Sequence, residues 1–359
     1  WATRIRSLSG LLLCFCFFIN IMIKQKICPK ALKAMEINLD GKYDVVIVGA
    51  GPTGIYASVK LAEEGLSVLV IEEDTEVGRP RFCTGLIGKD AFDRFSLPQE
   101  AIEGEFRSAW VFSPLGAKVC LKSNMQVCVT NRTTFDQGLY RRAKEKGVEF
   151  LLNCHCSGLK VNDDYAEVRI VFDNTEITIR SKVAILATGI KYNLHRCINL
   201  MPPEDFLDCS QIQVAGESQG DIEVFIGNSI APYSFAWIVP LKDKKLRIGL
   251  SPRQNSLSFL KSFLKYLRLK GRIQEENFNN IIRRPIPLGV IKNTYASRIL
   301  VVGDAAGQVK PTTGGGIYFG LICADLAAKT IIAAFRKNDF SKNSFRHYEI
   351  EWKKKIEFD

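Results

Sequence analysis

The sequence lacks the spacing that would place it among disulfide-stapled or metal-binding proteins. Its 359 residues include 11 cysteines, an odd number, and no two of them form a Cys-x-x-Cys pair. A disulfide framework or a zinc site needs regularly spaced cysteines, so we expect neither. Cys154 and Cys156 lie two apart, where a strand would place both on one face, and we interpret them as reduced structural thiols. This cysteine usage indicates a reducing compartment, the cytoplasm.

Neither a low-complexity tract nor an internal repeat occurs, and no segment matches a nucleic-acid-binding motif. The chain nevertheless has a formal net charge of +11. Residues 1–34 contain six basic residues and no acidic one, and residues 242–272 contain ten basic residues against the single Asp243. Such a bias without a nucleic-acid motif favours an acidic ligand or an anionic membrane surface as partner, and no nucleic acid is expected.

The apolar run near the start of the chain falls short of transmembrane length. It covers residues 11–23 and is interrupted only by Asn20. The Lys-rich flank after it lacks the small-residue cleavage site of a signal peptide. An upstream extension, a membrane anchor and a signal all remain open for residues 1–34, and we expect the enzyme proper to begin near Met35.

The first motif that the sequence does contain is a nucleotide-binding unit. Residues 44–50 form a short β-branched run typical of a buried parallel strand. A Gly-x-Gly-x-x-Gly turn follows, then a helix over 55–64 and a second buried strand over 67–71. We expect the nucleotide to contact the turn and the acidic pair after the second strand: Gly49, Gly51, Pro52, Thr53, Gly54, Glu72 and Glu73.

The residue types in this unit have separate physical roles. Gly49 permits the tight turn, Gly51 lets the backbone approach a pyrophosphate, and Gly54 lets helix and strand pack closely. The helix N-terminus offers free N–H groups to the phosphates. Glu72 is placed to accept hydrogen bonds from the adenosine ribose. Strand, glycines, helix, strand and acid in this order predict a dinucleotide site.

The far end of the chain identifies the dinucleotide. A strand over 298–302 leads into Gly303 and Asp304, and a glycine-rich turn precedes a long apolar helix over 318–335. This resembles the second FAD fingerprint of p-hydroxybenzoate-hydroxylase-type flavoproteins, in which the aspartate binds the ribityl chain and the helix start faces the flavin. Ala187-Thr188-Gly189 resembles their ATG turn. The resemblance implies FAD, with these further contacts: Ala187, Thr188, Gly189, Gly303, Asp304, Gly314, Gly315, Gly316 and Ile317.

A narrower resemblance, to the geranylgeranyl reductase family, covers residues 44–347. The loop 78–88 is similar to that family's cysteine-containing loop, and Arg132 begins an R-x-x-F-D segment whose arginine lies near the flavin. The stretch 235–240 is similar to a Y-x-W-x-F-P substrate motif, although Phe235 replaces its tyrosine and Val239 its second aromatic residue. The resemblance implies an FAD-dependent reductase of isoprenoid double bonds, acting on prenyl lipids. Its substrate contacts would be Phe235, Trp237 and Pro240.

The chemistry of such a reductase requires an acid. An isolated C=C bond is poorly polarised, so hydride delivery to one carbon must be accompanied by protonation of the other. Cys83 is the candidate proton donor, and a plain structural thiol is its alternative. We expect Arg79 and Arg81 to contact cofactor phosphate or ribose. The external electron donor, NAD(P)H or ferredoxin, stays open.

The middle of the chain predicts a sheet of short strands over 211–214, 222–226, 235–239 and 246–250. Phe235 and Trp237 would share one face of it, in either a substrate pocket or the core. A basic amphipathic helix follows over 256–270, capped by Asn255. It either lies on a membrane surface or packs on the core with a solvated back.

We therefore predict an α/β fold: a Rossmann-type FAD-binding domain with an inserted antiparallel β-sheet substrate domain. The first comprises residues 35–110, 131–205 and 291–359, and the second 111–130 and 206–290. A flavin monooxygenase or halogenase on the same fold is the first alternative, although the oxygenase-type run after Gly189 is missing. A non-catalytic FAD-binding electron carrier is the second.

Overall fold

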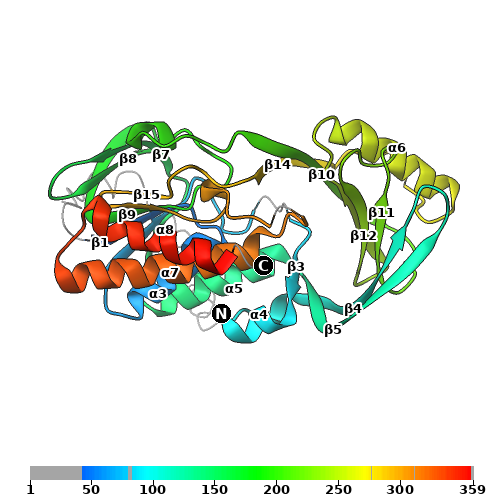
Figure 1. The fold of residues 1–359 in the computed structure, drawn as a ribbon, viewed down its shortest axis with the longest axis horizontal. Helices are drawn as coiled ribbons and strands as arrows, with labels where there is room; N and C mark the ends of the chain where they lie inside the picture. Colours follow the sequence, from blue (N-terminus) through cyan, green and yellow to red (C-terminus); the bar gives the residue numbers. More distant parts are fainter. Residues whose placement is uncertain (1–42, 80–82, 276, 311, 357–359) are drawn as a thin grey trace, which may run out of the picture.

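Two lobes lie along the long axis of the molecule, and each is built around one β-sheet (Figure 1). The computed structural model describes residues 43–79, 83–275, 277–310 and 312–356. The predictions for residues 1–34, Met35 and Arg81 therefore lie outside the described residues.

The first sheet has a parallel centre made of short apolar strands. Its order is β15-β16-β9-β1-β2-β6, and β7 and β8 are joined to it through β9. Only the pairings β15–β16, β7–β8 and β8–β9 are antiparallel among these strands. Their bounds are β1 Tyr43–Val48, β2 Val68–Ile71, β6 Glu149–Leu151, β7 His155–Val161, β8 Ala166–Phe172, β9 Thr175–Leu186, β15 Tyr295–Ala296 and β16 Ile299–Val301.

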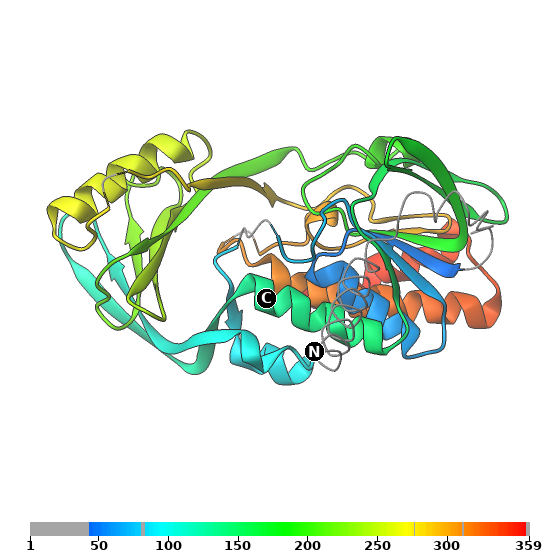
Figure 2. The same ribbon diagram turned by 180° about the vertical axis from the view of Figure 1, so that it is seen from behind.

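Helices cover one face of this sheet (Figures 1 and 2). They are α3 Pro52–Ala62, α5 Arg132–Glu145, α7 Gly316–Lys337 and α8 Lys342–Ile356. Val45 and Ile47 of β1 point to the helices, whereas Val46 and Val48 point to the β7–β8–β9 layer, where Cys154 and Cys156 are buried as free thiols. The helix α7 is long and apolar enough to cross a membrane, but most of its apolar side chains are buried in this core.

The second sheet has the order β14-β10-β13-β12-β11-β4-β5-β3 and contains the four strands expected from the sequence. Its pairings are antiparallel except for the parallel pair β11–β4. The predicted domain boundary at residue 110 falls inside β4, and the division into domains stays a prediction. The bounds are β3 Leu86–Gly88, β4 Ile102–Phe112, β5 Lys118–Thr130, β10 Asp205–Ala215, β11 Ile222–Ile226, β12 Phe235–Leu241, β13 Lys245–Leu250 and β14 Ile282–Leu288.

Four short helices of the described residues lie in the connections between these elements: α4 Lys89–Arg94, η1 Gln99–Ala101, η2 His195–Ile198 and η3 Gly303–Ala306. The helix α6 Ser256–Leu269 covers the outer face of the second sheet (Figure 1). Its apolar residues Leu260, Phe263, Leu264 and Leu267 are buried against that face. The basic residues of α6 lie on its exposed side. The structure thus shows the predicted arrangement in which the helix packs on the core with its basic side outward.

The N-terminus of α6 corrects one prediction. Asn255 occupies the cap position, but its φ is 59° and its side chain makes no capping hydrogen bond. The Ser256 N–H donates instead to Asp208 Oδ2, at 2.9 Å, from the neighbouring strand β10. Burial alone would raise the pKa of Asp208, but hydrogen bonds from Ser256 and Arg283 outweigh it and lower the pKa. A tertiary contact therefore caps this helix, which the local sequence could not reveal.

Replacing Asp208 with Ala should lower the free energy of unfolding at pH 7 by about 1–2 kcal/mol, because the cap of α6 is lost. The measurement is urea unfolding followed by circular dichroism. Since the pKa of Asp208 is lower in the folded state, its contribution is complete above the unfolded pKa and disappears as pH falls through the folded one. Asn255→Gly, which keeps the positive φ, is the matched control and should change little. Equal losses in both variants would contradict Asp208 as the cap.

Candidate active site

Four loops meet at the carboxyl ends of the parallel strands. They follow β1 at Gly49, β2 at Glu72, β9 at Ala187 and β16 at Val302. Backbone hydrogen bonds join them: Gly49 N–H donates to Ile71 O at 2.8 Å, and Ala187 N–H donates to Val48 O at 2.8 Å. Ligands of open α/β sheets bind at this edge.

The three glycines of the nucleotide turn differ in the space around them. A Cβ on Gly49 would lie 2.3 Å from Ala187 O, and one on Gly54 would lie 2.1 Å from Gly49 O. A Cβ on Gly51 would meet no protein atom within 4 Å, and its φ of −73° and ψ of 172° suit any residue. Gly49 and Gly54 are therefore required by the fold, whereas Gly51 borders space that a ligand can enter.

Glu72 is held in place by the backbone around it. Ala50 N–H donates to its Oε2 at 2.7 Å, and Asp74 N–H donates to its Oε1 at 3.0 Å. Burial raises the pKa of Glu72, although these two hydrogen bonds oppose the effect. Each carboxylate oxygen retains a lone pair for a further donor, so the carboxylate is prepared for two ribose hydroxyls. The adjacent Glu73 forms an ion pair with Lys191 instead.

The second predicted half of the cofactor site lies directly against the first. A Cβ on Gly303 would lie 3.0 Å from Thr53 Oγ1, and one on Gly320 would lie 2.4 Å from the same atom. A Cβ on Gly316, the first residue of α7, would lie 2.8 Å from Asp304 Oδ1. Asp304, a residue of this second half, thus stands at the positive N-terminal end of α7. Burial raises its pKa, while Arg284 and Arg132 oppose this.

The segment after Gly189 fixes the position of Asp304, which the sequence did not show. Tyr192 Oη donates to the Asp304 carbonyl at 3.0 Å, and the ring of the fully buried His195 bonds Ala305 O through Nε2 at 2.7 Å. Burial lowers the pKa of His195, so the ring is neutral at pH 7. A neutral imidazole can bond a carbonyl only through a protonated nitrogen, so Nε2 carries the proton.

A cavity of about 300 Å³ is lined by Cys83, the expected proton donor, and by Arg132, the arginine expected near the flavin. Arg132 is the first residue of α5 and forms an ion pair with Asp136 at 2.9 Å. Burial alone would lower the pKa of Arg132, but the Asp136 carboxylate and the Cys83 thiol raise it. The guanidinium is therefore charged beside the thiol. The cavity lining is Cys83, Asn131, Arg132, Gln211, Ile212, Gln213, Arg247, Asn280 and Ile282.

The second sheet holds the Cys83 loop in place. Gln211 of β10 donates to Cys83 O at 3.2 Å and accepts from Thr84 Oγ1 at 3.0 Å. Arg247 of β13, only 4% exposed, donates to the carbonyls of Thr84 and Thr130 and pairs with Glu103 at 3.4 Å. Sequence reasoning missed both residues, because nothing local to them points to the distant loop.

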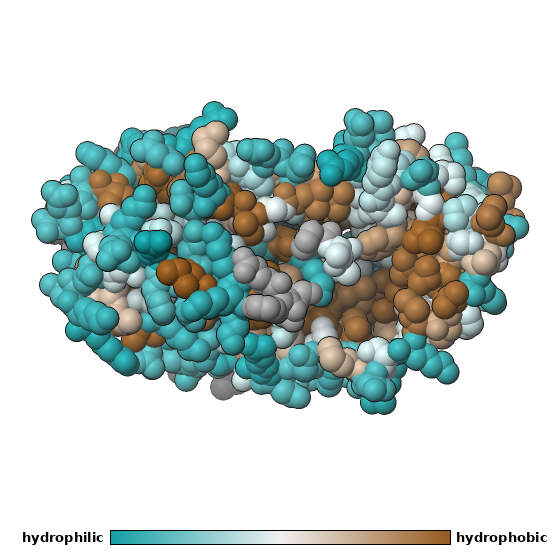
Figure 3. Space-filling view, in the orientation of Figure 1, coloured by the Kyte–Doolittle hydropathy of each residue, from teal (hydrophilic) through white to brown (hydrophobic). Residues whose placement is uncertain are grey.

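One face of the second sheet is apolar and turns toward the first lobe. Phe235 and Trp237 lie on it, with ring centroids 5.8 Å apart, and Trp237 packs with Val129, Cys209, Ile222 and Val239. Figure 3 shows hydrophobic side chains around a hollow over this part of the molecule. Pro240 lies on the opposite face, paired with Leu246, because strand side chains alternate. The position of Pro240 therefore does not support its predicted contact with the substrate.

The remaining predicted residues lie at the edge of the site. Gly314 and Gly315 precede α7, where a Cβ on Gly314 would lie 3.3 Å from Ile286 Cδ1, and Ile317 is half-buried in the first turn. Arg79 is exposed and pairs with Glu76 at 3.3 Å.

Arg284 of β14 lies near the site but was not predicted from the sequence. A Cβ on Gly189 would lie 2.8 Å from its Nη2. The segment around Arg284 contains two prolines, so the sequence did not indicate a strand there.

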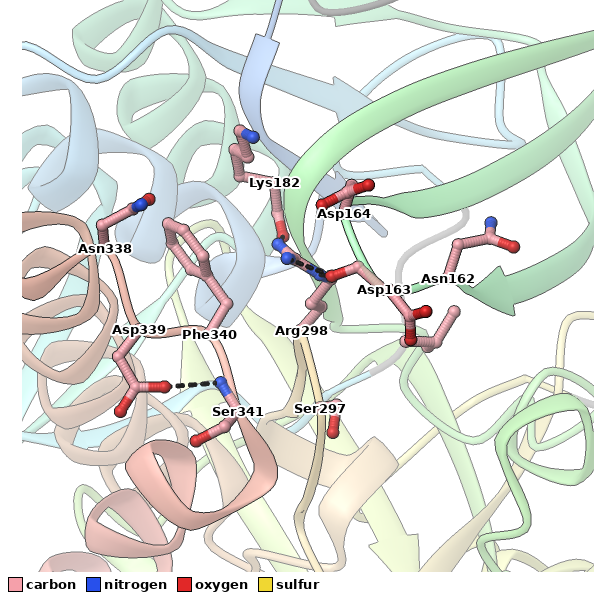
Figure 4. Close-up of a pocket in the computed structure, with 11 residues that line it drawn as sticks. Asn162, Asp163, Asp164, Lys182, Ser297, Arg298, Asn338, Asp339, Phe340 and Ser341 are labelled. Carbon is pink, nitrogen blue, oxygen red and sulfur yellow. Dashed lines mark hydrogen bonds between the residues drawn. The ribbon is translucent and has the colours of Figure 1, made fainter.

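A larger pocket, of about 540 Å³, lies at the other end of the parallel strands (Figure 4). Arg298, just before β16, donates there to the carbonyls of Asp163 at 2.9 Å and Lys182 at 3.1 Å. Its side chain thus joins the β7–β8 turn to β9. The pocket borders the amino end of β16 and the part of β9 where its parallel pairing with β1 begins, opposite Gly49 and Gly303, so it is not part of the cofactor site.

Comparison with known proteins agrees with this geometry. Residues 44–190 match the family described as FAD dependent oxidoreductase. The digeranylgeranylglycerophospholipid reductase of Methanocaldococcus jannaschii is 32% identical over 330 residues, which cover 88% of this chain and 84% of that protein. The chain belongs to this reductase family. A second member, from Methanothermobacter thermautotrophicus, is 31% identical over 332 residues, covering 88% and 84%. The protein is an FAD-dependent oxidoreductase.

Solved structures show the same fold. The geranylgeranyl bacteriochlorophyll reductase-like protein of Thermoplasma acidophilum has a TM-score of 0.81 at 23% identity, covering 88% of this chain and 84% of that chain. The flavin-dependent brominase Bmp2 has a TM-score of 0.71 at 19% identity, covering 86% and 83%. At these identities both likenesses concern the fold alone. The open space at Gly51, the carboxylate of Glu72 and the joined halves at Thr53 and Gly303 fit FAD.

Replacing Gly51 with Val should abolish bound FAD and leave the protein folded, because the new side chain enters only the space assigned to the pyrophosphate. Flavin absorbance relative to protein after gel filtration measures the loss, and thermal unfolding of the flavin-free proteins measures the fold. Gly54→Ala is the comparison and should destabilise the fold itself, since its Cβ meets the Gly49 carbonyl. A fully flavinated Gly51→Val protein would refute the assignment.

Proposed function

We propose that this enzyme reduces carbon–carbon double bonds of isoprenoid chains on prenylated lipids. The observation that carries the proposal is the position of Cys83 and Arg132 in one cavity, on the loop and helix that border the apolar face of the second sheet. A proton donor beside an apolar surface suits an alkene in a long hydrocarbon chain. The names of its relatives, which are digeranylgeranylglycerophospholipid reductases, support the same substrate class.

The residues of the cavity account for the proton in this reaction. When bound and reduced, FAD supplies a hydride to one alkene carbon. The Cys83 thiol gives its proton to the other carbon: the S–H bond breaks, a C–H bond forms, and a thiolate remains. The charged Arg132 guanidinium beside it stabilises that thiolate. Solvent returns the proton through the cavity, so each double bond gains two hydrogen atoms and Cys83 is restored.

The apolar face of the second sheet binds the chain of the substrate in this proposal. Trp237, which is paired with Gly249 next to Gln211, lines the part nearest the site, and Phe235 lies farther out, paired with Ile226. Gln211 and Arg247 fix the loop that carries the thiol. Peripheral membrane contact through residues 256–270 and a cytoplasmic location stay predictions. Since the apolar side of α6 is buried in the core, any contact of this helix with a bilayer would use its basic side.

Reduced enzyme mixed anaerobically with a geranylgeranyl lipid should reoxidise, and mass spectrometry should show two hydrogen atoms added per reduced bond. Cys83→Ala should slow this step by about 100-fold or more while FAD stays bound, because the acid is lost and the cofactor contacts are not. Cys197→Ala, at an exposed cysteine, is the matched control and should react as the unmodified protein does.

Two outcomes would contradict the proposal. A product that forms only in oxygen and gains an oxygen atom would make the protein a monooxygenase. Equal rates for Cys83→Ala and Cys197→Ala would remove the thiol from the reaction and leave it as a structural group.

A further inference from the structure

The β4–β5 hairpin and the end of β11 expose a group of large apolar side chains. We call Leu115, Val119, Leu121 and Ile226 the hairpin patch; they are 97%, 58%, 57% and 42% exposed. Such side chains are rarely grouped on a surface that faces only water. The outer half of β5 is also an edge, since β3 pairs only with residues 127–129 of this strand.

The hairpin patch continues the apolar face that borders the active site. Val119 is paired with Val111 and Leu121 with Ala109, and these residues of β4 are paired with Val224 and Ile222 of β11. Directly paired residues point to the same side of a sheet, so one face runs from the hairpin to Trp237, the partner of Val224.

The turn that carries Leu115 is attached to the end of β11. A Cβ on Gly227 would lie 2.3 Å from the ring of Pro114, and Phe112 stacks on Phe225 with centroids 4.7 Å apart. The hairpin patch is therefore one firmly packed surface at the outer end of the apolar face.

The outer part of the hairpin has charges of one sign, whereas the two acidic residues of β4 lie at its base. Residues 107–125 contain Arg107, Lys118 and Lys122 and no acidic residue. All three basic side chains belong to exposed residues. Lys118 and Lys122 are paired with Phe112 and Ser108, so they point to the opposite side of the hairpin from Val119 and Leu121. A hairpin with apolar side chains on one side and cations on the other suits insertion into the headgroup region of an anionic bilayer, where the apolar side faces the acyl chains and the cations reach the phosphates.

We infer that the hairpin patch docks the enzyme on an anionic lipid bilayer and delivers the isoprenoid chains of lipid substrates along the apolar face of the second sheet to the site at Cys83. This inference rests on the proposed function for its substrate. Leu115, Val119, Leu121 and Ile226 enter the acyl boundary, and Arg107, Lys118 and Lys122 contact the phosphates.

Cosedimentation of the full-length FAD-loaded protein with vesicles of phosphatidylglycerol and phosphatidylcholine tests the docking. Val119→Glu/Leu121→Glu should weaken binding by about 10-fold or more, because two apolar side chains become charged. Met201→Glu, which changes an exposed apolar residue outside the hairpin, is the matched control and should bind normally. Reversal of Lys261, Lys265 and Arg268 to Glu tests α6 in parallel and should weaken binding less than the hairpin variant does.

Activity on two forms of the substrate tests delivery. The hairpin variant should lose a much larger fraction of its activity on a geranylgeranyl lipid embedded in vesicles than on the same lipid solubilised in detergent, and equal losses on both forms would contradict delivery from the bilayer. Normal vesicle binding by this variant, or a larger effect of the α6 reversal, would overturn the inference. The same holds if gel filtration shows the unmodified protein to be a dimer and the hairpin variant to be a monomer, because the patch would then bind a second copy of the chain. An unmodified protein that docks through the patch but reduces neither form would refute the proposed function and leave the docking intact.

Discussion

The first turn of α3 packs directly against backbone atoms of the neighbouring loops, and this close contact fixes the position of the rest of the site. Gly49 and Gly54 have no room for a side chain because the Ala187 and Gly49 carbonyls occupy it, and Thr53 fills the space at Gly303 and Gly320. Three loops far apart in the sequence are thereby held together at one end of the sheet. Of the three glycines of the nucleotide turn, only Gly51 faces open space, so the fold itself sets the position of the space expected to take the phosphates.

The proposed proton donor depends on the other lobe. Cys83 lies between β2 of the first sheet and β3 of the second, and hydrogen bonds from Gln211, Arg247 and Thr130 of the second sheet hold its loop. The orientation of the lobes therefore sets the distance between this thiol and the cofactor. A change in the packing of the second sheet would alter the chemistry even where every cofactor contact is preserved.

The sequence predicted those parts whose signals are local. The strand–turn–helix unit, the second fingerprint and the middle strands all carry their own patterns, and the structure contains them. It did not predict β14, because Pro285 and Pro287 argue against a strand; they are tolerated since β14 is an edge strand paired only with β10. Asp208, Gln211 and Arg284 act on groups distant in the chain, so no local pattern marks them.

The parallel pair β11–β4 has a consequence for how the chain folds. Its partners are residues 109–112 and 222–225, and the segment between them supplies α5 and six strands of the two sheets. Closing so long a loop costs entropy until the intervening chain is ordered. The central pairs β1–β9 and β9–β16 of the first sheet also join segments far apart in the chain, with strands of the second sheet between them. Neither sheet can therefore close independently of the other, so the cofactor-binding edge and the surface proposed to take up lipid are products of one assembly step.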